Sequence, residues 1–162
     1  MTDFYGRFGA VSLTLLGLWV IVVQTRYEAW AGSPGHRRQA TAVAITFGLP
    51  GSMSFLSLVD PDRALVWRAS FVVGGVLGAA AILAVVVDRA GRPSDPKAAI
   101  GLWTCGVLHG AIAVTAAVAG PLRRSDFGLT PLQTEALLFS LVMSVGLAVA
   151  WLLLFADVDR AT

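Results

Sequence analysis

The sequence predicts an all-α polytopic membrane protein, a bundle of five transmembrane helices that forms a single domain over residues 1–162. Hydrophobic residues make up 56% of the chain and charged residues only 14%, and the mean hydropathy is +0.74. This composition is too apolar for a soluble domain. Five apolar runs are also long enough to cross a hydrocarbon core, which needs roughly 20 helical residues. Four of these runs follow a capping side chain and a proline.

The five predicted helices cover approximately residues 4–24, 40–59, 69–87, 98–119 and 136–155. The last four runs contain no Asp, Glu, Lys or Arg. The first contains Arg7, which lies close enough to the end of the run for its side chain to reach the lipid head groups. Because lipid offers the backbone no hydrogen-bond partners, we expect helices rather than irregular structure.

The chain also carries signals for where its helices begin. The second to fifth runs are preceded by Ser33-Pro34, Asp60-Pro61, Asp95-Pro96 and Thr130-Pro131. A side-chain oxygen at this position accepts a hydrogen bond from a free backbone N–H, and proline at the first helical position costs no hydrogen bond. Thr130 and Gln133 also have the spacing of a capping box. Each signal therefore predicts a helix that starts at the proline.

The second predicted helix contains an irregularity at Pro50-Gly51. Pro50 cannot donate a hydrogen bond to the carbonyl of Thr46, and we expect the helix to be kinked or broken there. One interpretation is a discontinuous or re-entrant helix, as in transporters. The hydroxyls that would line its polar path are those of Thr46, Ser52, Ser54 and Ser57. The other interpretation is a proline kink whose freed carbonyl accepts a hydrogen bond from a nearby serine.

Small residues four positions apart predict close helix packing, because apolar burial does not drive helix pairing in lipid. The third helix carries Gly74 and Gly78, and the fourth carries Gly106 and Gly110. The fifth helix carries a similar stripe of Ser140, Ser144 and Ala148. These stripes indicate a compact bundle that packs against copies of itself or against a partner in a larger membrane complex.

His109 stands alone as a titratable group within its apolar run, and Cys105 lies four residues earlier on the same helical face. Near the bilayer centre a neutral imidazole has one donor and one acceptor to satisfy. Three roles follow: a hydrogen bond between helices, a proton-relay or ligand-binding group beside the Pro50 irregularity, or an axial ligand of haem b. A metal site is not predicted, because the other histidine, His36, lies in the first loop and the chain has one cysteine.

Glu135 is the acid closest to an apolar core and joins the candidate ligand or ion pathway. The apolar runs contain no paired carboxylates, and the chain has no nucleophile elbow and no phosphate-binding loop, so enzymatic activity is not indicated. The sequence favours transport or small-ligand binding within the bundle. The alternatives are an accessory or scaffold subunit of a larger membrane complex and, third, a haem- or quinone-associated membrane enzyme.

The distribution of basic residues predicts the orientation. Seven Lys and Arg residues fall on the side of the C-terminus and five on the side of the N-terminus, which favours an outside N-terminus and a cytoplasmic C-terminus. Abundant Arg, Ala and Gly suggest a bacterial plasma membrane. No clustered basic face predicts nucleic-acid binding. Residues 1–31 also resemble a signal peptide that ends in Ala29-Trp30-Ala31, and cleavage there would leave four helices.

Overall fold

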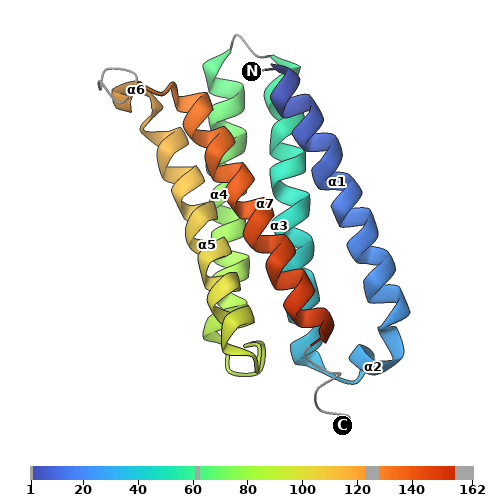
Figure 1. Ribbon diagram of the computed structural model, residues 1–162. Helices are drawn as coiled ribbons and strands as arrows, with labels where there is room; N and C mark the ends of the chain where they lie inside the picture. Colours follow the sequence, from blue (N-terminus) through green and yellow to red (C-terminus); the bar gives the residue numbers. More distant parts are fainter. Residues whose placement is uncertain (1, 61–62, 123–127, 156–162) are drawn as a thin grey trace.

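The computed structural model describes residues 2–60, 63–122 and 128–155, and all regular structure in these ranges is helical. Five long helices run up and down side by side (Figure 1): α1 (Thr2–Thr25), α3 (Pro34–Val59), α4 (Ala64–Val87), α5 (Pro96–Ala117) and α7 (Pro131–Phe155). Short helices α2 (Tyr27–Ala31) and α6 (Ala119–Leu122) lie in two connections. Each long helix is long and apolar enough to cross a membrane, so the predicted all-α bundle is confirmed.

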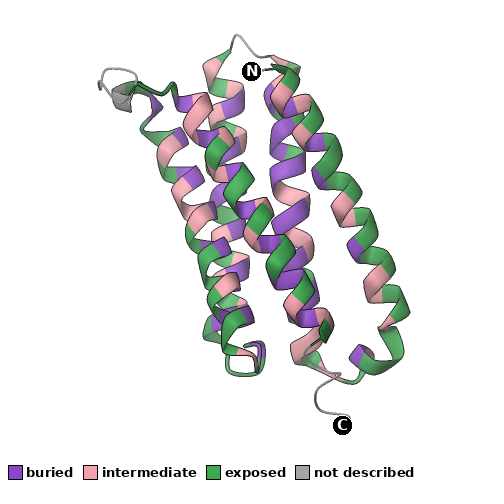
Figure 2. Ribbon diagram, viewed as in Figure 1, coloured by how far each residue is buried: buried purple, intermediate pink, exposed green. Residues whose placement is uncertain are grey.

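Helix α3 lies at the centre of the bundle. It packs against α1, α4 and α7, while α5 closes the other side against α4 and α7 (Figure 1). Half of the apolar segment of α3 is buried, compared with 17% of that of α1. Figure 2 shows the same contrast, with α1 exposed along much of its length. The bundle therefore consists of four helices in a ring, in the order α3, α4, α5 and α7, with α1 packed outside this ring mainly against α3.

Three of the four predicted helix starts are found, at Pro34, Pro96 and Pro131. The Asp95 carboxylate accepts a hydrogen bond from the Lys97 N–H at 2.8 Å, and the Ser33 hydroxyl accepts one from the His36 N–H. At the start of α7 the capping box is complete. The Gln133 N–H donates to the Thr130 hydroxyl, and the Thr130 N–H donates to Gln133 Oε1 at 2.7 Å. These caps explain why the helices begin before the apolar runs.

The fourth predicted start is wrong, because α4 begins at Ala64 rather than at Pro61. Asp60 ends α3, and its carboxylate accepts a hydrogen bond from the Arg63 N–H and pairs with the Arg63 guanidinium at 3.2 Å. The capping contact therefore holds the connection between two helices instead of the first turn of α4. Pro61 itself lies outside the described residues.

Helix α3 continues without interruption through Pro50, so the interpretation of a broken or re-entrant helix is wrong. The Ser12 hydroxyl of α1 donates to the Phe47 carbonyl at 2.6 Å, one turn before the proline. The Thr46 hydroxyl donates to the Ala42 carbonyl within the same helix. A proline removes one backbone hydrogen bond, and in a bundle neighbouring helices and hydroxyls compensate. The carbonyl that Pro50 frees is that of Thr46, whereas Ser12 donates to the neighbouring Phe47 carbonyl, so a kink repaired by a serine stays a prediction.

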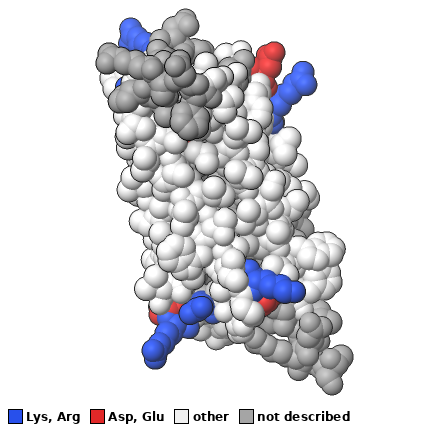
Figure 3. Space-filling view, turned by 60° about the vertical axis from the view of Figure 1, so that its left-hand side comes forward, with Lys and Arg blue, Asp and Glu red and all other residues white. Residues whose placement is uncertain are grey.

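The apolar interior divides into two clusters. The lower cluster, near α2, includes Phe47, Ile82, Leu102 and Val149. The upper cluster, near the N-terminal end of α1, includes Met53, Phe71, Ile112 and Phe139. On the face shown in Figure 3 the charged side chains gather at the two ends of the molecule and leave an uncharged band between them. Such a band is what a multi-pass membrane protein presents to lipid.

Candidate functional site

Between the two apolar clusters, each of the four central helices contributes a small or polar residue. These residues, which we call the central layer, are Pro50, Gly78, His109 and Gly146. In chain order, each lies between a member of the lower cluster and a member of the upper cluster. The ring of His109 contacts Gly78, since a Cβ built on Gly78 would lie 2.2 Å from His109 Cδ2. His109 is thus the one polar side chain of a layer otherwise formed by glycine and proline, between the two apolar clusters.

His109 is fully buried, with 0% of its surface exposed. Its Nδ1 lies 2.8 Å from the carbonyl oxygen of Cys105, so Nδ1 carries a proton and donates it to that carbonyl. In this tautomer Nε2 is an acceptor, and no described residue donates a hydrogen bond to it. His109 therefore presents an unused lone pair inside the bundle.

The glycines predicted to pack helices lie at contacts within the protomer. Gly74 receives the Met53 side chain from α3, and Gly106 receives Leu83 from α4. Gly110 faces Ala79 with more space, because an added Cβ would be 3.9 Å from the Ala79 methyl. The similarly spaced stripe of Ser140, Ser144 and Ala148 is exposed on the outside of α7. The same four-residue spacing of small residues therefore occurs both at helix contacts inside the protomer and on an exposed surface.

The α3 hydroxyls predicted for a polar path divide into two groups. Thr46, Ser54 and Ser57 are buried, whereas Ser52 is exposed on the outer side of the helix. The Ser57 hydroxyl donates to the Ser54 carbonyl at 2.7 Å, but the Ser54 hydroxyl has no partner within residues 2–60, 63–122 and 128–155. Cys105, a free and buried thiol, lies beside the Thr46 hydroxyl. The structure therefore places Thr46 and Cys105 near His109, buries Ser54 and Ser57 in α3, and leaves Ser52 outside.

Glu135 is the centre of a second polar group, which we call the acid cluster and which also contains Thr115 and Tyr5. Glu135 is 0% exposed. The Thr115 hydroxyl donates to Glu135 Oε1, while Oε2 has no partner in the part of the chain that the structure describes. Tyr5 lies beside the carboxyl and donates its own hydroxyl to the Leu132 carbonyl at 2.8 Å. Among the described ion pairs, none neutralises Glu135.

Sequence reasoning identified Glu135 but missed its partners. Thr115 looks like any helical threonine, since its hydroxyl can also donate to the Ala111 carbonyl of its own helix at 3.0 Å. Tyr5 is distant in sequence and joins the cluster because α1 crosses the start of α7. No residue pattern predicts either contact, because each contact depends on which helices become neighbours.

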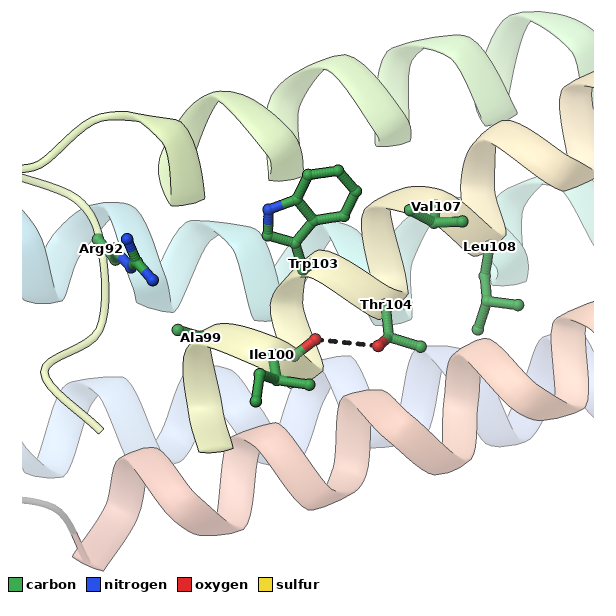
Figure 4. A pocket seen from close by; sticks show the side chains of 7 residues that line it. All are labelled: Arg92, Ala99, Ile100, Trp103, Thr104, Val107 and Leu108. Atoms are coloured by element: carbon green, nitrogen blue, oxygen red, sulfur yellow. Dashed lines mark hydrogen bonds between the residues drawn. The ribbon is translucent and has the colours of Figure 1, made fainter. Parts of the chain in front are cut away.

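The described surface grooves lie away from both polar groups. One groove of about 380 Å³ follows α5 (Figure 4), where Ala99, Ile100, Trp103, Thr104, Val107 and Leu108 line it and Arg92 lies at one end. The Thr104 hydroxyl donates to the Ile100 carbonyl, so the groove wall is largely apolar. Neither His109 nor Glu135 lines this groove or the two grooves beside α3. The polar interior is therefore enclosed by packed helices.

The surroundings of His109 do not fit a haem. Its ring rests on Gly78, and the backbones of α4 and α5 approach so closely that a Cβ on Gly75 would lie 2.6 Å from the His109 carbonyl oxygen. A porphyrin could reach Nε2 only if these two helices separated. Across the described part of the chain, no three His, Cys, Asp or Glu side chains are grouped so that they could hold a metal ion.

Comparisons with known proteins assign no family. The chain matches no protein-family model, and no curated protein or solved structure is significantly similar to it. Its function must therefore be argued from the two polar groups and the packing around them.

Proposed function

We propose that this chain is a small membrane transport protein, and that the solute bound by its interior groups is a proton. One observation carries the proposal. Three fully buried polar atoms on three different helices have no hydrogen-bond partner among the described residues: Ser54 Oγ, His109 Nε2 and Glu135 Oε2. The broader prediction from the sequence, transport or small-ligand binding within the bundle, includes this function.

The energetic cost of these atoms supports a functional role. A buried polar group without a partner costs about 1–3 kcal/mol, and lipid offers no water to relieve that cost. Apolar side chains at the same positions would make a merely structural bundle more stable. Ionisable residues inside membrane helices mark ion and proton pathways for this reason.

The chemistry and packing favour a proton over a larger solute. A hydroxyl, an imidazole and a carboxyl can each accept and donate a proton. His109 and Thr115, which binds the Glu135 carboxyl, are six residues apart on α5, so the two polar groups are separated by about 9 Å along the helix axis. Met53 against Gly74 and the His109 ring against Gly78 leave little room for a bulkier ligand.

Proton flux into proteoliposomes tests the proposal directly. A potassium diffusion potential would drive protons through the purified protein, and an internal pH-sensitive dye would report them. We expect Glu135→Gln and His109→Gln each to reduce flux at least tenfold, because neither amide can relay a proton. Glu28→Gln, at an exposed acid on α2, is the matched control and should retain wild-type flux. Wild-type flux no greater than that of protein-free liposomes would refute the proposal.

The orientation forms part of the proposal. Among the described residues, six basic side chains lie at the α2 end of the bundle: Arg26, Arg37, Arg38, Arg89, Arg92 and Lys97. Only Arg7, Arg63 and Arg68 lie at the other end. Because basic residues favour the cytoplasmic side, we place the α2 end in the cytoplasm and the start of α1 outside a bacterial plasma membrane.

A second candidate, an accessory subunit of a membrane complex, is favoured by the exposed stripe on α7. Ser140, Ser144 and Ala148 form a smooth surface on which another helix could pack closely. Ser144→Phe should then disrupt association in mild detergent, measured by light scattering, whereas Val76→Phe on the exposed side of α4 should not. If the wild-type protein is monomeric and no partner co-purifies, this candidate fails.

A further inference from the structure

A groove between α1, α2 and α3 lies at the basic end of the bundle, away from both polar groups. Its volume is about 370 Å³, within the range of about 300–1,000 Å³ that is typical of small-ligand sites. Trp19 and Trp30 form its floor, each only 4% exposed. We call it the indole groove.

The floor of the indole groove is apolar and fixed in place. The Trp19 indole N–H donates to the Ala40 carbonyl at 2.9 Å, which ties α1 to α3. The two indole rings lie 6.1 Å apart. Val20 and Val23 of α1 and Ala44 of α3 extend the apolar wall toward the middle of the bundle. This part of the groove fits a hydrocarbon chain.

The rim of the groove is polar and carries an uncompensated positive charge. Gln24, Tyr27, Thr41 and Arg37 line it. Arg37 is exposed and forms no ion pair with a described acid, whereas the adjacent Arg38 pairs with Asp88. Arg37 also lies near the start of α3, where the helix dipole is positive and the first turn has no acidic residue. An anionic group would be favoured beside Arg37.

We propose that the indole groove binds one anionic phospholipid. The phosphate contacts Arg37 at the rim, and an acyl chain lies over Trp19 and Trp30. The charge complementarity favours an anionic over a zwitterionic head group, since a zwitterionic lipid brings no net charge to the unpaired guanidinium. The groove opens at the end of the bundle with more basic residues, where anionic lipids add attraction of their own.

Quenching of tryptophan fluorescence by brominated lipid tests the site in the membrane-embedded protein. Trp103→Phe and Trp151→Phe would remove two exposed indoles, 50% and 64% accessible, that lie outside the groove. The remaining emitters are Trp19, Trp30 and the buried Trp67. We expect brominated phosphatidylglycerol to associate about fivefold more strongly than brominated phosphatidylcholine, the ratio expected from one basic residue at a membrane surface.

Two charge variants separate a specific site from general surface attraction. Arg37→Gln should reduce the fivefold preference to about one, while Arg89→Gln, an exposed arginine at the same end that lines none of the described grooves, should keep it. Equal quenching by the two lipids, or an equal effect of both variants, would overturn the proposal. Neither result depends on proton flux, so this site and the proposed transport function can fail separately.

Discussion

Two helix pairs in this bundle are held together in different ways. Helices α4 and α5 meet through glycines that bring their backbones together, most closely at Gly75, where an added Cβ would lie 2.6 Å from the His109 carbonyl oxygen. Helices α1 and α3 approach less closely, since a Cβ added at Gly9 would lie 3.4 Å from the Gly51 carbonyl oxygen. They are joined by two buried side-chain hydrogen bonds, from Ser12 to the Phe47 carbonyl and from Trp19 to the Ala40 carbonyl. The side-chain bonds between α4 and α5, from Arg68 to the Ala116 and Ala117 carbonyls, lie nearer the surface.

The difference shows two ways in which apolar helices can associate in lipid. Apolar helices gain little by leaving lipid for each other, so they associate through close van der Waals contact or through interhelical hydrogen bonds. The close-packed pair contacts the His109 ring and leaves no space for an added methyl group at Gly75. The hydrogen-bonded pair depends on a few polar groups and leaves α1 largely exposed. The two interfaces should therefore respond differently to the same substitution.

The largest effect is expected at Gly75. Gly75→Ala would place a methyl group 2.6 Å from the His109 carbonyl oxygen and 2.7 Å from the Ala113 nitrogen, and backbone atoms cannot move aside locally. We expect a loss of about 2–3 kcal/mol in the free energy of unfolding, as for overpacked cores. Unfolding in mixed micelles with increasing SDS would measure it. Gly110→Ala, with 3.9 Å to Ala79, is the control and should change stability by less than about 0.5 kcal/mol.

A smaller effect is expected at Gly78, because the obstacle there is a side chain. Gly78→Ala would push on the His109 ring, 2.2 Å from the new Cβ. The double variant with His109→Ala should recover part of the loss, with a coupling energy of about 1–2 kcal/mol, within the range measured for contacting residues. Strictly additive effects in the same SDS titration would show that the ring does not rest on Gly78.

Much of the fold could be predicted from the sequence, because the length of an apolar run and a capping residue before proline are local properties. The start of α4 could not, since Asp60 makes its capping contact within the turn that precedes the helix. The sequence also did not show which of the small-residue stripes faces the interior of the bundle. Gly74 and Gly78 contact α3 and α5, whereas Ser140 and Ser144 have the same spacing and are exposed.

The candidate site was predicted in part. His109 and Glu135 were recognisable because each is a titratable group in or beside an apolar run. Thr115 and Tyr5 were not, since their contacts with Glu135 exist only after α1, α5 and α7 become neighbours. The composition of α1 does not indicate its peripheral position either. Its mean hydropathy of 1.9 resembles the value of 1.7 for the more buried α3.

At the hydrogen-bonded pair, Ser12→Ala should cost about 0.6 kcal/mol, the average for interhelical hydrogen bonds in membrane proteins. The Phe47 carbonyl would lose the bond from α1 that supplements its place in the helix, close to Pro50. Thr14→Ala is the control, since that hydroxyl donates to the Ala10 carbonyl of its own helix. If both variants unfold at the same SDS fraction, the bond from Ser12 does not hold α1 in place.

The smallest effect is expected at Gly51, where α1 faces α3. An added Cβ would approach Leu13 Cδ2 and Ser12 Cβ at 3.1 Å, and the leucine can turn because it is partly exposed. Replacing glycine by alanine within a helix also gains about 0.5–1 kcal/mol in backbone propensity. The two terms should nearly cancel, so Gly51→Ala should unfold within about 0.5 kcal/mol of wild type. Gly17→Ala, with no atom within 4 Å of the new methyl, should show only the gain in stability from helix propensity. A loss at Gly51 as large as that at Gly75 would mean that both helix pairs depend on close backbone contact.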